Sequence, residues 1–242
     1  MPRANRVSCS GLIWHITHRC HEKSYLLRFV RDRRKWRHWL YEAKRRYGLI
    51  VLNYIATSNH IHILAVDQGN EEISRSMQLL AGRTAQEYNT RKNRNGAFWE
   101  DRYNATAVQS DRHLLRCITY IDLNMVRAGV VLHPSDWEIS GYHEIQVPRQ
   151  RKGIIDHTVL LKLTGLPTID ALQRSHEEWI RKELNTTQRN PIWTESVGVG
   201  DSKFLSDLKL RLGPAGYHRK VGYTDGINYL RDESAIHRRF DA

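Results

Sequence analysis

The sequence predicts an α+β fold, in which an antiparallel sheet and its covering helices are followed by a mainly helical C-terminal extension. Three observations support this class. Short β-branched and aromatic segments alternate with longer segments of helical periodicity over residues 12–128. Two of the apolar segments are separated only by a short polar turn, as in a β-hairpin. Beyond residue 130 the pattern is irregular, and only short helical segments stand out.

The first elements follow directly from local patterns. Residues 12–17 (LIWHIT) are a predicted strand because β-branched and aromatic side chains alternate between faces. Residues 28–47 are a predicted helix, with apolar side chains at helical spacing, and Gly48 ends it. Residues 49–56 (LIVLNYIA) and 60–66 (HIHILAV) are predicted strands on either side of a Thr-Ser-Asn turn, so we expect them to pair.

The next elements complete a recognisable order. Residues 71–91 have helical spacing of apolar side chains, and residues 103–108 read as a fourth strand. A third helix is predicted over residues 111–128, with Gly129 placed to end it. The first six elements have the order β-α-β-β-α-β, which predicts a ferredoxin-like antiparallel sheet with helices on one face. The helix over residues 111–128 is an addition to that unit.

A polar, basic segment marks the expected domain boundary. PRQRKG, residues 148–153, is flanked by Pro and Gly and separates two differently patterned parts of the chain. We therefore expect a core over residues 1–147 and a helical C-terminal extension over residues 148–242. Short helices are predicted in the extension over residues 154–163, 169–184 and 202–212.

Charge gives the first indication of function. The 242 residues carry a net charge of +12, and residues 1–50 alone hold 13 Lys and Arg against 3 Asp and Glu. A localised basic surface favours binding to nucleic acid, although a solvated basic helix face would look the same. No apolar run reaches the roughly 18 residues that span a bilayer, and no signal core begins the chain. Three cysteines without a C-x-x-C pair fit a soluble, reduced, intracellular protein.

His60 and His62 are the sharpest local feature. Side chains two positions apart on a strand project from the same face, so the two imidazoles could chelate one divalent metal ion. Two half-buried histidines with ordinary hydrogen bonds would give the same pattern.

The helix over residues 111–128 carries a polar row. Arg116, Tyr120, Asn124 and Arg127 recur at steps of four, four and three residues. A tyrosine hydroxyl beside arginines is a candidate nucleophile toward phosphate, and the Asn124 carbonyl oxygen could bind the same metal ion. A boundary tyrosine without chemical function is the alternative.

These motifs resemble the REP-associated tyrosine transposases, a branch of the HUH single-strand transposases. The matching segments are MPRANRV, WHITHRC, TSNHIHIL, FWEDRY, YIDLNMVRAGVV and WTESVGVGDSKF, in the family's order. His-x-His followed some 55–60 residues later by Y-I-x-x-N-x-V-R-A-G is the specific part of this resemblance. Two departures stand out: Met125 replaces a usual proline, and Thr57-Ser58 replaces a common Met-Pro.

The resemblance implies a metal-dependent single-stranded DNA endonuclease and strand transferase. Tyr120 matches the nucleophile, while His60, His62 and Asn124 match ligands of Mg²⁺ or Mn²⁺. The expected substrate is a hairpin-forming repeat, cut through a 5′-phosphotyrosine. Candidate DNA contacts are Arg102, Arg116, Arg127, Trp14 and Trp99. We expect a bacterial cytoplasmic, nucleoid-associated monomer or homodimer without a membrane partner.

Two binding-only functions compete with this interpretation. RNA-recognition domains share the ferredoxin-like topology, but no aromatic run of their type occurs on a predicted strand. A domesticated relative that binds hairpins without cutting them would keep the basic surface, and only the intact set of four site residues argues against it.

Overall fold

The computed structural model describes residues 10–186 and 189–232, so the MPRANRV segment lies outside the described residues. The first six elements are β1 (Ile13–Arg19), α1 (Val30–Tyr47), β2 (Ile50–Ala56), β3 (His60–Val66), α2 (Glu72–Lys92) and β4 (Asn104–Val108). Their order is the predicted one, and their bounds differ from the predicted ones by two residues at most. The α+β class is confirmed.

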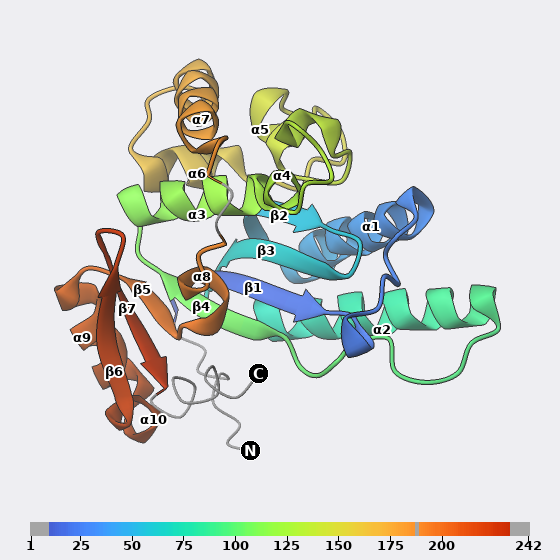
Figure 1. Cartoon of the computed structure of the whole chain (residues 1–242), viewed down its shortest axis with the longest axis horizontal. Coiled ribbons are helices and arrows are strands. Elements are labelled where there is room, and N and C mark those ends of the chain that lie inside the picture. Colours follow the sequence, from blue (N-terminus) through green and yellow to red (C-terminus); the bar gives the residue numbers. More distant parts are fainter. Residues whose placement is uncertain (1–9, 187–188, 233–242) are drawn as a thin grey trace.

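A seven-stranded sheet forms the centre of the molecule, with the order β2-β3-β1-β4-β5-β7-β6 (Figure 1). The pairings among β1 to β4 are all antiparallel: β1 pairs with both β3 and β4, and β3 also pairs with β2. The parallel pairing of β4 with β5 makes the sheet mixed.

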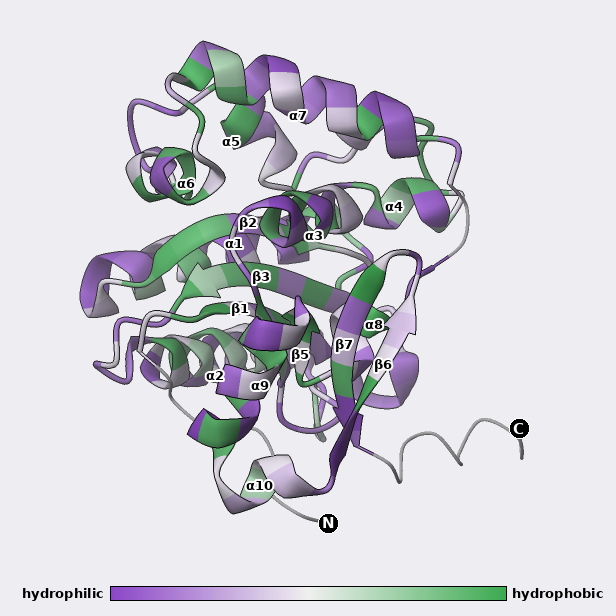
Figure 2. Cartoon of the chain, turned by 90° about the vertical axis from the view of Figure 1, so that its left-hand side faces the viewer, coloured by the Kyte–Doolittle hydropathy of each residue, from purple (hydrophilic) through white to green (hydrophobic). Residues whose placement is uncertain are grey.

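Helices cover both faces of this sheet. On one face α1 packs against α2, and the Trp36 ring of α1 contacts Tyr54 of β2 at 6.2 Å between centroids. On the other face lies α3 (Arg112–Asp122), whose Asp122 accepts a hydrogen bond from Asn53 of β2. Figure 2 shows α3 lying between the hydrophobic strands and the helices of the extension.

The predicted helix over residues 111–128 is divided in two. Helix α3 ends at Asp122, and the short helix α4 (Asn124–Arg127) follows after Leu123, whose φ and ψ are −78° and 5°. Leu123 is buried in a small cluster with Tyr142 and Ile180. We attribute the break to this packing, since no proline or glycine lies there.

The extension contributes both helices and strands. Its helices are α6 (His157–Thr164), α7 (Ile169–Glu183), α8 (Ile192–Glu195), α9 (Ser202–Leu212) and α10 (Pro214–Tyr217). Before the extension lie α5 (Tyr142–Gln146) and two short 3₁₀ turns, His21–Lys23 and Pro134–Asp136. Helices α6 and α7 contact the outer side of α3. Among the described residues, no helix is both long and apolar enough to cross a membrane.

The expectation of a mainly helical extension misses three strands at its C-terminal end. Strands β5 (Gly198–Gly200), β6 (Arg219–Thr224) and β7 (Ile227–Asp232) continue the sheet beyond β4. Strand β5 is too short to show a pattern. The β6–β7 hairpin turns at Asp225 and Gly226, which have φ of 49° and 74°. An Asp-Gly pair in a two-residue loop is a strong sequence signal for such a hairpin. The division into parts at residue 148 stays a prediction.

Candidate metal and tyrosine site

The predicted histidines lie on one face of the two central strands. In the antiparallel register of β1 and β3, Thr17 lies opposite His62 and Arg19 lies opposite His60. Opposite residues of an antiparallel pair share a face, as do alternate residues of one strand, so His15 joins this group. Hydrophilic segments accordingly interrupt the hydrophobic length of β3 (Figure 2). The result is a polar strip in the middle of a sheet.

Helices α3 and α4 bring Tyr120 and Asn124 onto this strip. The Tyr120 ring centroid lies 6.1 Å from that of His62, nearly perpendicular to it. Asn124 Nδ2 donates to His62 Nε2 at 3.1 Å. The ring centroids of His60 and His62 are 4.9 Å apart. The structure thus brings together all four residues of the predicted centre.

The turn before β3 fixes His60. Its Nδ1 donates to Asn59 Oδ1 at 2.7 Å and lies 3.0 Å from Thr57 Oγ1. The same Thr57 hydroxyl donates to the His60 carbonyl at 2.8 Å and so closes the turn. Thr57 is one of the two residues that stand where the resembled family commonly has Met-Pro. With the proton on Nδ1, His60 Nε2 keeps its lone pair for a metal ion.

Burial keeps the two imidazoles neutral. It lowers the pKa of His60 to about 4, helped by the charges of Arg19 and Arg189. Burial also lowers the pKa of His62 well below its usual value, with smaller effects from His60, His15, Arg189 and Arg127. Neutral imidazole is the form that binds metals, so neither ligand must lose a proton near pH 7.

Tyr120 is a buried tyrosine in contact with a cation. It is only 5% exposed, and the guanidinium carbon of Arg127 lies 4.6 Å from its ring centroid. Arg127 Nη2 also donates to the Tyr120 backbone carbonyl. Burial lowers the pKa of Arg127, while the neighbouring Tyr120 acts in the opposite direction. The structure therefore places a positive charge against the face of the Tyr120 ring.

The donor set fits a divalent ion with open coordination positions. Within residues 10–186 and 189–232, no group of three or more His, Cys, Asp or Glu side chains is arranged to hold a metal ion. A metal centre therefore depends on the Asn124 amide as third ligand, and a half-turn of that amide presents Oδ1 in place of Nδ2. The amide oxygen is a donor that suits Mg²⁺ and Mn²⁺, whereas the two imidazoles also suit Zn²⁺, Fe²⁺, Ni²⁺ and Cu²⁺.

The residues predicted to contact DNA are scattered. Arg102 is exposed, and Arg116 is exposed on α3 with its Nη2 donating to the Asp225 carbonyl at 3.1 Å. Trp99 stacks on His18 at 4.2 Å between centroids, outside the histidine–tyrosine centre. Trp14 lies in the hydrophobic core at 6% exposure, so a base could reach it only if the core opened. Of this set, the structure brings only Arg127 to the centre.

The basic helix α1 lies on the sheet face opposite the centre, and part of its charge is used inside the protein. Arg34 pairs with Glu138 at 2.7 Å, and Arg45 pairs with Glu42 at 2.9 Å. Lys44 Nζ donates to the Ile154 carbonyl at 2.9 Å. These contacts reduce the cations of α1 that are free to meet phosphates.

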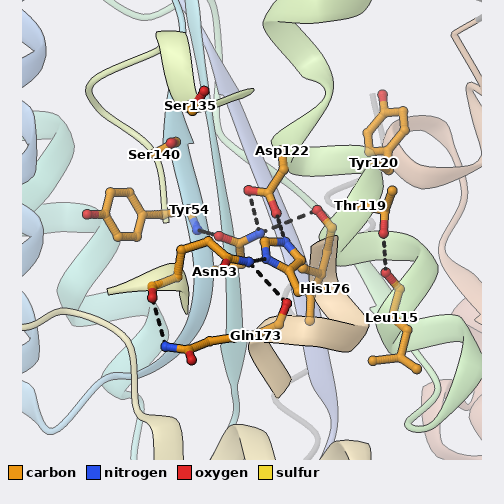
Figure 3. A network of polar contacts seen from close by, with 12 residues as sticks. Asn53, Tyr54, Leu115, Thr119, Tyr120, Asp122, Ser135, Ser140, Gln173 and His176 are labelled. Carbon is orange, nitrogen blue, oxygen red and sulfur yellow. Dashed lines mark hydrogen bonds and ion pairs between the residues drawn. The ribbon is translucent and has the colours of Figure 1, made fainter. Parts of the chain in front are cut away.

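A buried polar network holds the end of α3 in place (Figure 3). Asp122 Oδ2 accepts from His176 Nε2 of α7 at 2.8 Å, and its Oδ1 accepts from Asn53 Nδ2 of β2 at 3.1 Å. Gln146 Nε2 of α5 donates to His176 Nδ1 at 2.9 Å. Because Asp122 lies midway in sequence between Tyr120 and Asn124, this network ties the two site residues to the sheet and the extension.

Sequence reasoning missed three residues of the site: His15, Trp193 and Asp122. The alternation of the WHITHRC strand places His15, Thr17 and Arg19 on one face, but only knowledge of the strand pairing shows that this is the face of His62. No local pattern around Trp193 or Asp122 indicates their partners.

Fold and site together define an α+β protein in which a pair of histidines on a sheet faces a tyrosine on a covering helix. Residues 8–124, which contain all four central residues, match the sequence model of the family described as "Transposase IS200 like". This part of the chain belongs to the IS200-like Y1 transposase family.

One solved structure extends the likeness beyond this segment. The chain is similar to a REP-associated tyrosine transposase bound to a REP hairpin, with a TM-score of 0.51 and 21% sequence identity. The match covers 70% of this chain and 90% of that chain, and at this identity it shows a shared fold. A search of curated proteins found no match.

Proposed function

We propose that this protein is a metal-dependent single-stranded DNA endonuclease and strand transferase that acts on hairpin-forming repeats through a 5′-phosphotyrosine on Tyr120. The observation that carries the proposal is the approach of Tyr120 and Asn124 to His62 on the sheet, inside the segment that matches the transposase family. The antiparallel order β2-β3-β1-β4 supports a ferredoxin-like nuclease core beneath this centre.

The reaction needs no cofactor that supplies energy. The Tyr120 oxygen attacks the scissile phosphorus, and the bond from phosphorus to the 3′ oxygen breaks. The phenol proton is released, and the departing 3′ oxygen takes up a proton as a free hydroxyl. The new phosphotyrosine ester keeps the energy of the broken phosphodiester, so a second 3′-hydroxyl can reverse the step and join another strand.

The residues divide this work among themselves. His60 Nε2, His62 Nε2 and Asn124 Oδ1 are the proposed ligands of Mg²⁺ or Mn²⁺. Such an ion, when bound, neutralises charge on the scissile phosphate. The Arg127 guanidinium lies 4.6 Å from the centroid of the Tyr120 ring and places a positive charge beside the proposed nucleophile. Burial of Tyr120 holds the ring against the imidazoles and keeps water away from it.

Hairpin DNA is the proposed partner because the structurally similar transposase was solved on a REP hairpin. Arg102 and Arg116 are exposed cations available to the DNA backbone, together with the remaining charge of the N-terminal segment. Residues 148–242 contribute α8 to the centre and are the proposed second contact with the hairpin.

The test is covalent trapping with hairpin oligonucleotides copied from the repeats that flank the gene. Wild-type protein with Mn²⁺ or Mg²⁺ should give a denaturant-resistant adduct and a free 3′-hydroxyl, and EDTA should prevent both. Tyr120→Phe should bind the hairpin but form no adduct. Tyr142→Phe is a matched control, since Tyr142 is also buried, at 7% exposure.

Two outcomes would contradict the proposal. An adduct mapped to another tyrosine would move the active centre. Tight binding by the wild-type protein, with neither cleavage nor adduct at any metal concentration, would identify a domesticated hairpin-binding protein instead.

A further inference from the structure

A continuous chain of hydrogen bonds runs from the C-terminal part of the protein to the proposed metal position. His15 Nδ1 lies 2.8 Å from the backbone carbonyl oxygen of Trp193 in α8. His15 Nε2 lies 2.8 Å from His62 Nδ1, and His62 Nε2 lies 3.1 Å from Asn124 Nδ2. Both imidazoles are at most 2% exposed, so water cannot replace these partners.

The Trp193 end of this chain dictates where the protons lie. A carbonyl oxygen can only accept, so His15 Nδ1 must donate to Trp193, and a neutral His15 then has an accepting Nε2. His62 Nδ1 must therefore carry the proton that it shares with His15. The carbonyl of Trp193 therefore sets the tautomer of His62, whichever way the Asn124 amide is turned.

We propose that His15 is a positioning residue, which with the Trp193 carbonyl holds His62 in the Nδ1–H tautomer and aims its Nε2 lone pair at the metal position. This inference rests on the proposed function for the existence of the metal ion. It assigns a role in the centre to α8, which lies outside the segment that matches the transposase family.

The placement of α8 supports this role. Helix α8 contacts both β1 and β4, and the Trp193 ring lies 6.1 Å from the Tyr120 ring. Thr106 Oγ1 of β4 donates to the Ser196 carbonyl at 2.6 Å, which anchors the segment that follows α8. Trp193 of α8 therefore contacts Tyr120, the proposed nucleophile, with its ring. Its backbone carbonyl contacts His15, the hydrogen-bond partner of His62.

A metal-binding histidine usually donates its other ring N–H to an acceptor, and removing that acceptor typically lowers metal affinity by about 10–100-fold. His15→Phe keeps a ring in the cavity but removes both nitrogens, so His62 Nδ1 loses its acceptor. We expect the affinity for Mn²⁺ in the absence of DNA to fall by about tenfold or more. His15→Gln keeps an acceptor oxygen and should recover part of this loss.

His18→Phe is the matched control. His18 lies on the same strand but on the opposite face, is also buried at 6% exposure, and also bonds a backbone carbonyl, that of Asp101 at 2.8 Å. The two phenylalanine variants should lose similar stability, whereas only His15→Phe should weaken Mn²⁺ binding.

The measurements are Mn²⁺ titration by electron paramagnetic resonance and long-range ¹H–¹⁵N correlation spectra of the histidine rings without metal. The spectra of the wild-type protein should show His62 as the Nδ1–H tautomer, a result that needs no folded variant. An Nε2–H tautomer of His62, or unchanged Mn²⁺ affinity in folded His15→Phe, would overturn the inference. If the wild-type protein bound no Mn²⁺, the proposed metal centre would fail, while the tautomer would still decide the role of His15.

Discussion

Replacing Asp122 with alanine should destabilise the protein strongly, because the carboxylate has two buried partners. The side chains of Asp122 and His176 are both 0% exposed. Alanine leaves His176 Nε2 without its acceptor, and it leaves Asn53 Nδ2 with only the Ile118 carbonyl, at 3.4 Å. A hydrogen bond to a charged group contributes about 1.5–3 kcal/mol, so losing both bonds to the carboxylate costs about 3–6 kcal/mol. We expect a loss of about 4 kcal/mol in the free energy of unfolding.

An intermediate variant makes this estimate sharper. Gln146 donates to His176 Nδ1, so His176 donates to Asp122 from Nε2, and Asn53 donates to Asp122 from Nδ2. Both partners of Asp122 are therefore donors, whereas Asn at this position would offer one acceptor oxygen. Asp122→Asn should keep one of the two hydrogen bonds and lose about half as much stability as Asp122→Ala.

Thermal and urea unfolding measure both effects. For a chain of this size, 1 kcal/mol corresponds to roughly 2–4 °C in Tm, so Asp122→Ala should lower Tm by about 10 °C. Glu178→Ala is the control, because it removes a carboxylate from an exposed i,i+4 pair with Lys182 on the same helix as His176. Equal shifts for Asp122→Ala and Glu178→Ala would refute the reasoning.

Three further predictions concern pH, metal and salt. The folded pKa values of His15 and His60 are about 4, below the reference of about 6.5, so the unfolded chain takes up protons first as the pH falls. Stability should be complete above about pH 6.5 and fall toward pH 4 by up to about 3 kcal/mol per imidazole; a flat profile in urea unfolding between these pH values would contradict this. His60→Ala and His62→Ala should each abolish cleavage and largely spare hairpin binding, and full Mn²⁺-dependent cutting by either variant in a nicking assay would exclude that ligand. Hairpin affinity should weaken steeply with salt, because residues 1–50 carry an excess of 10 positive charges; a nearly flat plot of log affinity against log salt would show that the paired cations of α1 leave no DNA surface.

Local patterns were sufficient for the elements that carry the candidate site. A period of two placed His60 and His62 on one face of a strand, and helical spacing placed Tyr120 and Asn124 one turn apart. The first relation depends only on backbone geometry within β3, whereas the second persists although the predicted helix is divided at Leu123 into α3 and α4. The β-α-β-β-α-β order is likewise a product of local periodicity, which is why it could be predicted without the structure.

Contacts between distant segments were decided only by the tertiary structure. His15 and His62 are 47 residues apart, His15 and Trp193 are 178 apart, and Asp122 and His176 are 54 apart. A single buried histidine or aspartate has no periodic signature, because its partner is chosen by how the elements pack. Strands β5 to β7 were missed for a related reason, since three residues such as Gly198–Gly200 become a strand only when β4 offers an open edge to pair with. The sequence by itself therefore determined which side chains could bind a metal ion and attack a phosphate, and packing determined that they meet.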